Sequence, residues 1–201
     1  MSFLPENYRS PEGNYSKFKP GENTFRILGS AIVGYEYWDT ANKPRRSPTP
    51  FASIPADIRV EEDGKYSIKH FWMFPIWSYD NQKVQIMEVT QKGIQEAIKA
   101  IVTNKKWGDP TKYDITVTKE GTGFETSYQV MPSPHTELDS LAAASWLAIK
   151  LDLSVIYEGG DPFMPKATED HSTPFDEVES KQAKERREIA EQAVESNIAS
   201  G

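Results

Sequence analysis

Hydrophobic and polar residues alternate along five stretches between positions 21 and 132, with the period of two that is typical of β-strands. Gly29 and Gly34 interrupt the first stretch and indicate either bulges that bend it or a close approach of another backbone. Asp80-Asn81 and Gly121-Thr122-Gly123 indicate turns between paired strands. The predicted strands comprise residues 24–38, 69–79, 83–89, 113–119 and 124–130.

A period near 3.6 replaces the alternation after the third strand and predicts a helix. Thr90 stands where its hydroxyl can accept a free backbone N–H of the first turn, and Trp107-Gly108-Asp109-Pro110 ends the helix. A weaker helical pattern covers residues 136–150, and the apolar residues 151–157 that follow fit a short strand or a helix end equally well. The apolar face of the first helix consists of Ile94, Ala97, Ile98, Ile101 and Val102.

The second predicted strand, residues 69–79, carries rings on both of its faces. Successive side chains of a strand point to opposite faces, so one set can face the core while the other needs a different cover. That cover is either another part of the chain or a ligand with flat apolar faces. One face presents Lys69, Phe71, Met73 and Trp77, and the other presents His70, Trp72, Phe74 and Ile76, of which Trp72 and Phe74 are assigned to the core.

The element order is strand, long loop, strand, strand, helix, strand, strand, which is the order of an OB-fold. The sequence therefore predicts a mainly β protein with a five-stranded barrel over residues 21–132. The long loop runs from Asp39 to about Asp63, and the prolines between positions 43 and 50 predict that it lacks regular structure. Residues 1–20 form an N-terminal arm in this division, residues 133–158 a helical extension packed on the barrel, and residues 159–201 a flexible acidic tail.

Charge is distributed unevenly along the chain. The formal net charge is −7, but residues 1–132 hold 17 basic and 16 acidic residues, whereas residues 133–201 hold 6 and 14. A near-neutral body with an acidic end predicts a tail that repels, or competes for, whatever the body binds. Residues 180–195 fit either a charged helix that folds on a partner or part of a disordered solubilising tail.

Composition excludes several classes of protein. The chain has no cysteine, which excludes disulfides and thiolate metal sites, and its three histidines lack the spacing of metal ligands, so we expect no metal and no cofactor. No stretch approaches the roughly 20 apolar residues of a membrane span, and no secretion signal is apparent at Met1, so we expect a cytoplasmic protein. No phosphate loop, dinucleotide turn or nucleophile elbow is present, which argues against an enzyme.

Rings beside cations suit a single nucleic-acid strand, whose bases stack and whose phosphates need neutralising. For each ring the alternative is core packing, and for each cation it is an ordinary solvated charge. Arg45 and Arg46 are the strongest cation candidates, because arginines in a loop can close over a strand and stack on bases. The stacking candidates are Tyr37, Trp38, Phe71, Trp77 and Tyr79, and the phosphate-binding candidates are Arg26, Lys43, Arg45, Arg46, Lys69, Lys83 and Lys119.

Residues 15–132 resemble the single-stranded DNA-binding proteins encoded by tailed bacteriophages. The segments that carry the resemblance are 19–28, 35–38, Phe71-Trp72, Pro75-Ile76-Trp77, 85–91, Trp107-Gly108-Asp109-Pro110 and Tyr113-Asp114-Ile115. The resemblance implies an OB-fold, sequence-independent binding of single strands during phage replication, recombination or repair, and location in the host cytoplasm.

The resemblance also implies an acidic C-terminal tail that recruits replication or recombination proteins. The chain departs from the family in lacking the cysteines of a zinc site that some members carry, and in ending on Ser200-Gly201 rather than on acids closed by an aromatic residue. Its acidic and aromatic tail residues lie earlier, at Glu169, Asp170, Phe175, Asp176 and Glu177.

The alternative function is that of an OB-type adaptor, whose aromatic face binds a replisome or assembly protein. Salt separates the two functions, because phosphate binding weakens linearly on a log–log salt plot and an apolar protein interface does not. In either case we expect a monomer, which in the first case assembles on DNA.

Overall fold

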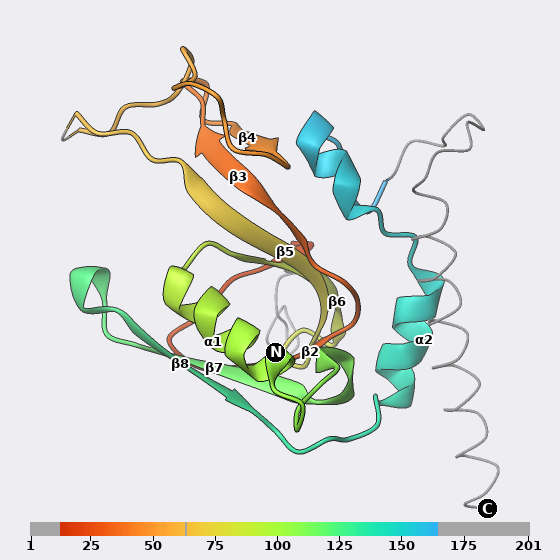
Figure 1. Ribbon diagram of the computed structural model, residues 1–201. Coiled ribbons are helices and arrows are strands. Elements are labelled where there is room, and N and C mark those ends of the chain that lie inside the picture. The colour runs from red at the N-terminus through yellow and green to blue at the C-terminus, as the bar shows by residue number, and fades with distance from the viewer. Residues whose placement is uncertain (1–12, 63, 165–201) are drawn as a thin grey trace, which may run out of the picture.

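One mixed β-sheet dominates the computed structural model, which describes residues 13–62 and 64–164 (Figure 1). The strands follow the order β1-β6-β5-β2-β7-β8, and β3 joins this path by pairing with β5 and with β4. The protein is therefore mainly β, as the sequence predicts. The eight strands are β1 (Tyr15–Ser16), β2 (Gly21–Ile27), β3 (Ile32–Trp38), β4 (Pro44–Ser47), β5 (Lys69–Ser78), β6 (Lys83–Val89), β7 (Asp114–Glu120) and β8 (Ser127–Pro132).

The two halves of β5 pair with different strands on the same edge. Its first half pairs with β3, its last residues pair with β2, and β6 follows the opposite edge. Between Ile27 and Ile32 the chain uses residues 28–31 to pass only Phe74 and Pro75 of β5, so two residues bulge out. Pro75 cannot donate a ladder hydrogen bond, which favours the break at this point.

The structure has more strands than the five that the sequence predicts. The first predicted strand divides into β2 and β3 at the bulge, and two short strands are added. One of them, β4, lies within the loop that was expected to be irregular, and this prediction is wrong. Pro44 is tolerated because it is the first residue of β4, opposite Trp38, and the Asp39 carboxylate closes the turn by accepting hydrogen bonds from the backbone N–H groups of Ala41 and Lys43.

The main core lies between the sheet and α1 (Lys92–Thr103). The helix buries Ile94, Ile98 and Ile101 against one face of β5, as its periodicity predicts. The prediction that Thr90 caps it is wrong, because Gln91 is the N-cap and no side chain caps this end. The first backbone carbonyl that accepts helical hydrogen bonds is that of Gln91, which places Thr90 one residue too early.

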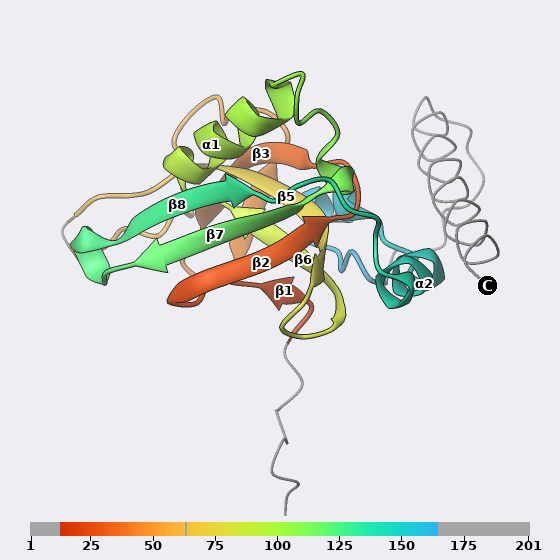
Figure 2. The same cartoon turned by 90° about the horizontal axis from the view of Figure 1, so that it is seen from below.

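The opposite face of β5 is covered by residues 138–163, which we call the cover. The cover contains α2 (Ser140–Ala148), whose N-terminus is capped by the Asp139 carboxylate, and the 3₁₀ helix η3 (Leu153–Glu158). Figure 2 shows α1 and α2 on different sides of the sheet. The helix predicted over residues 136–150 is thus shorter at both ends. Residues 153–158 form a separate 3₁₀ helix, and so are neither the short strand nor the helix end that the sequence left open.

A projection rises from the sheet beside this cover (Figure 1). It consists of β3, β4, the first half of β5 and the loop between them, residues 32–73, and we call it the finger. Two isolated bridges, Asp39 with Ile58 and Val60 with Tyr66, hold its long loop. In the part of the chain that the structure describes, no helix is long and apolar enough to cross a membrane.

Candidate nucleic-acid interface

Three of the five rings expected to stack on bases are buried, two of them, Phe71 and Trp77, under the cover. Phe71 is 0% exposed and Trp77 is 2% exposed. Phe71 lies 6.4 Å from the ring of Tyr157 in the cover, and Trp77 packs in one cluster with Ala142 and Trp146 of α2. The expectation that they offer free faces to a ligand is wrong, because the cover packs against this side of β5.

Opening the cover would be costly. Trp146, Leu153 and Ile156 are all at least nine-tenths buried. Each large apolar side chain contributes about 1.5–3 kcal/mol when buried, so these three together account for roughly 5–9 kcal/mol, against a total of about 5–15 kcal/mol for a typical domain. The Tyr157 hydroxyl also donates a 2.7 Å hydrogen bond to the Val33 carbonyl oxygen of the finger. The cover is therefore an integral part of the fold.

Arg26 is a structural ion, not a free phosphate ligand. It is 1% exposed, and its Nε lies 2.6 Å from Oδ1 of Asp114. Its remaining donors bind the carbonyl oxygens of Thr111 and Thr136 and the Thr136 hydroxyl, which fastens the chain leading into the cover. The predicted phosphate-binding role of Arg26 is corrected accordingly.

Tyr79 belongs to the same network and directly follows β5, at the end of the strand that is remote from the finger. Its hydroxyl donates a 2.8 Å hydrogen bond to Asp114, and its side chain is 36% exposed. Burial, with the Asp114 carboxylate second, raises the pKa of Tyr79 to about 12. The hydroxyl is thus engaged in holding the fold, while part of the ring stays accessible.

The two arginines predicted in the long loop, Arg45 and Arg46, lie in β4 and both have acidic partners. Arg46 is nearly buried between Glu36 and Glu88, at 3.2 and 2.7 Å, so it is held within the protein. Arg45 lies 2.8 Å from Asp39 but keeps 55% of its side chain exposed. Asp39 is itself buried, so the pair is held at the carboxylate, while the exposed part of Arg45 is still accessible to a phosphate.

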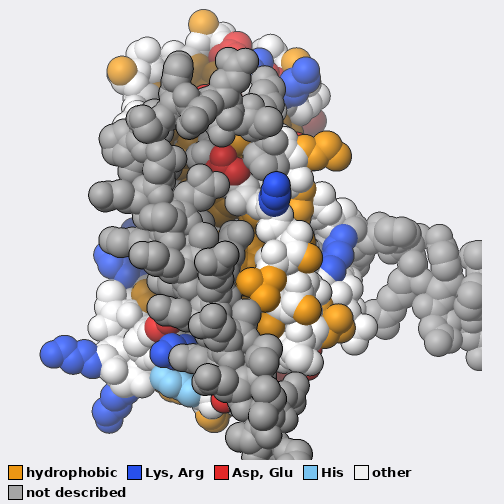
Figure 3. Space-filling view, turned by 90° about the vertical axis from the view of Figure 1, so that its right-hand side faces the viewer, with side chains coloured by type: hydrophobic (Ala, Val, Ile, Leu, Met, Phe, Trp, Pro, Cys, Tyr) orange, Lys and Arg blue, Asp and Glu red, His pale blue; other side chains and the backbone are white. Residues whose placement is uncertain are grey.

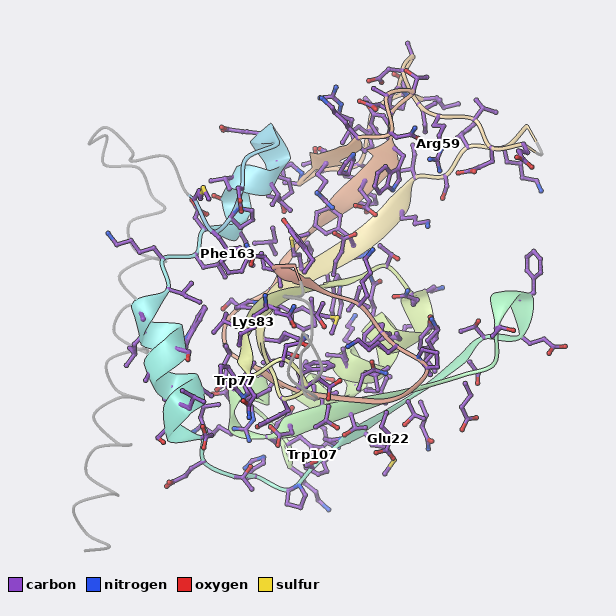
Figure 4. All side chains as sticks on the ribbon, turned by 180° about the vertical axis from the view of Figure 1, so that it is seen from behind. Glu22, Arg59, Trp77, Lys83, Trp107 and Phe163 are labelled. Carbon is purple, nitrogen blue, oxygen red and sulfur yellow. The ribbon has the colours of Figure 1, made fainter. Side chains whose placement is uncertain are left out.

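The other candidates divide between the finger and the body. Lys43 and Lys69 are exposed on the finger, and Trp38, 42% exposed, lies at the end of β3 opposite Pro44. Tyr37 is buried, with its hydroxyl on Asp57 and its ring against Phe51. Figure 4 shows Trp77 and Lys83 on the side of α2 and Arg59 out in the finger. Lys119 donates to the Phe18 carbonyl oxygen at 3.4 Å and also belongs to the body.

A different set of rings is accessible on the side of the finger that faces α1. Strand register places Val33 opposite Trp72 and Tyr35 opposite His70, so all four side chains share one face, which we call the ring face. Val33 is 48% exposed and His70 is exposed, while Tyr35 and Trp72 are half-buried. The Tyr35 and His70 rings meet edge to face at 5.3 Å.

Gln95 of α1 fixes the ring face against the helix. Its side-chain amide donates to the carbonyl oxygens of His70 and Val89, and its Oε1 lies 3.3 Å from Nδ1 of His70. Sequence reasoning missed this face because Trp72 and Phe74 mark the same side of β5 as core. The signal was present in His70, a polar ring that breaks the apolar run where the core ends.

The opposite side of the finger carries a charged cluster at its base. Burial raises the pKa of Glu36 to about 7, the neighbouring Glu88 carboxylate adds to the rise, and Arg46 opposes it. Lys69 also lowers it, from the adjacent strand. Arg46 in addition lies 5.7 Å from the centre of the Phe71 ring. This cluster joins the finger to β6 and leaves the ring face as the accessible aromatic side.

The side of the molecule formed by α2 carries exposed apolar side chains. Figure 3 shows hydrophobic side chains among the described atoms of this side. Leu141 and Leu147 of α2 are 55% and 43% exposed.

The predicted partner-binding residues of the tail, from Glu169 to Glu177, lie outside the residues that the structure describes. Within residues 13–62 and 64–164, no three His, Asp or Glu side chains are grouped to hold a metal ion.

Comparison of the chain with protein families, with curated proteins and with solved structures finds no match in any of the three. The functional argument therefore depends on the residues themselves.

Proposed function

We propose that this protein binds single-stranded DNA without sequence preference, and that the bases lie on the ring face and not on the covered side of β5. The observation that carries the proposal is the pair of neighbouring cross-strand contacts, Val33 with Trp72 and Tyr35 with His70, left accessible on a finger with exposed cations. Base stacking on such rings contributes about 1–3 kcal/mol per base and is indifferent to sequence, since every base has a π-face.

Phosphate neutralisation in this proposal comes from cations of the finger that remain accessible. Arg45 is the register partner of Tyr37 and so lies on the same face as Tyr35, and the exposed Lys43 precedes it in the turn. Lys69 and Trp38 are also exposed, but they lie on the opposite face of the finger with Glu36. A strand on the ring face can therefore make phosphate contacts with the accessible part of Arg45 and with Lys43.

An OB-type barrel is the architecture that we propose for the body. The bent path β2–β3 pairs with both β5 and β7, and α1 stands between β6 and β7 along the chain. Both features fit the OB order of three strands, a helix and two strands. Together with the resemblance of residues 15–132 to phage single-stranded DNA-binding proteins, they support a role in replication, recombination or repair, in the cytoplasm of the host cell.

Tyr35→Ala tests the proposal directly. If the Tyr35 ring stacks on a base, its loss should weaken binding of oligo-dT by about 1–3 kcal/mol, measured by fluorescence anisotropy at fixed salt. The matched control is Leu147→Ala, which removes an exposed apolar side chain from α2.

Equal affinity of the Tyr35 variant and the control would remove the ring face from the site. Absence of binding by the wild-type protein would overturn the proposed function. The adaptor function would then be the one to pursue, with a partner whose binding changes little with salt.

A further inference from the structure

Four exposed lysines accompany α1, and we call them the lysine row: Lys92, Lys99, Lys105 and Lys106. Lys92 and Lys99 are seven residues apart, which places them on the same side of the helix about 10 Å from each other. Residues 92–106 contain one acidic residue, Glu96, and its pair with Lys92 at 3.6 Å is highly exposed and therefore weak. The outer side of α1 is thus clearly basic.

Helix stability does not account for the lysine in the first turn. The positive end of the helix dipole lies at the N-terminus, where acidic residues are favoured and cations are not. Yet the first turn of α1 contains Lys92 and no acidic residue, and the last turn contains no basic residue. Lys105 and Lys106 follow after the helix has ended. Lys99, Lys105 and Lys106 lie toward the negative end of the dipole, where cations are favourable, whereas the position of Lys92 brings the helix no such benefit.

The lysine row begins at the ring face. Gln95, one turn after Lys92, donates to the backbone carbonyl of His70, so the first turn of α1 adjoins the accessible rings. Figure 1 shows α1 running from the base of the finger along the sheet. A chain of negative charges that leaves the ring face can follow the helix without crossing the cover, which lies on a different side of the sheet (Figure 2).

We propose that the phosphate backbone of a bound single strand continues from the ring face along the lysine row, so that α1 forms the second part of the binding path. This inference rests on the proposed function and extends it to a surface that base stacking does not require. Lysine suits the role because it meets phosphates as a point charge and reads no sequence. The acidic C-terminal region, with 14 acidic and 6 basic residues after position 132, is the competing occupant.

The experiment compares two lengths of oligo-dT on the full-length chain. A strand of about 6 nucleotides is near the lower end of the roughly 4–16 nucleotides that an OB-fold covers, and one of about 20 exceeds it. The test variant is Lys99→Gln with Lys106→Gln. The control, Lys17→Gln with Lys150→Gln, removes the same charge from exposed positions near β1 and after α2. Thermal melting checks that all variants fold.

For the long strand, the test variant should lower the slope of log affinity against log salt by about 1.4, from about 0.7 for each lost phosphate contact. For the short strand, the salt slope of the test variant should equal that of the control variant. A test variant that matches the control on both strands would overturn the inference. Tighter binding of both strands by the test variant would indicate that the lysines bind the acidic C-terminal region and not DNA, and would overturn it too.

The proposed function and the inference fail differently. If the wild-type chain binds the long strand and Tyr35→Ala weakens it while the lysine variant does not, only the inference is lost. If the wild-type chain binds neither strand, the proposed function is lost and the inference with it.

Discussion

The two faces of β5 are both rich in rings, but they meet different neighbours along their length. On one face the cover reaches from Trp77 as far as Phe71, so both rings are core residues. On the other face the core ends at Trp72, and beyond it Gln95 of α1 hydrogen-bonds to His70. The aromatic content of a strand therefore does not indicate which face is free; the reach of the elements packed against it decides this.

The largest effect is expected from the covered face. Trp146→Ala should lower the free energy of unfolding by about 3–5 kcal/mol, because it leaves a cavity against Trp77 and Val84. Urea denaturation measures the change, with Leu147→Ala, the exposed neighbour, as the control. A loss as small as that of the control would mean that the cover is not packed on β5, and Trp77 would become a stacking candidate again.

Arg26→Ala separates a structural ion from a phosphate ligand. Breaking a buried ion pair costs about 3–5 kcal/mol, and the low end is expected because Asp114 is partly exposed. The salt dependence of oligo-dT binding should stay as in the wild-type protein, provided that binding is measured well below the melting temperature. A stable variant with a shallower salt slope would contradict this account and place Arg26 in the DNA path.

The free energy of unfolding should depend on pH through Glu36, which is buried at the base of the finger. Its carboxyl has a pKa of about 7 in the folded protein and about 4.5 in the unfolded chain. Between these values the folded state binds the proton more tightly, so stability falls as the pH rises through this window, by up to about 3 kcal/mol. Glu36→Gln does not titrate and should show a smaller fall in urea denaturation between pH 4.5 and 7. Parallel curves for variant and wild type would contradict the buried placement of Glu36.

Much of the fold follows from local patterns in the sequence. The alternation near Phe25 and the apolar face at Ile94 predict β2 and α1, because both depend on residues close together in the chain. The bend at Gly29 is also predicted, although its cause, two extra residues opposite Pro75, becomes visible only in the strand pairing. Gly34 has a different reason, since a Cβ there would collide with the Ser47 carbonyl oxygen and crowd the Phe71 ring.

The candidate site was less accessible to sequence reasoning, because burial depends on distant segments. Nothing near Phe71 in the chain indicates that Tyr157 and Ile156 cover it. In the same way, the solvated appearance of Arg26 and Arg46 in the sequence hides partners that lie 88 and 42 residues away. Trp38, Lys43, Arg45 and Lys69 remain candidates, since their exposure on the finger depends mainly on local hairpin geometry.

The central claim is that unpaired bases contact the ring face and leave the covered face of β5 untouched. Ultraviolet crosslinking of oligo-dT to the full-length protein, followed by mass spectrometry of the crosslinked peptides, tests it most directly. The account predicts crosslinks at Tyr35, His70 or Trp72 and none at Phe71 or Trp77. Crosslinks at Trp77 with none on the ring face would contradict it.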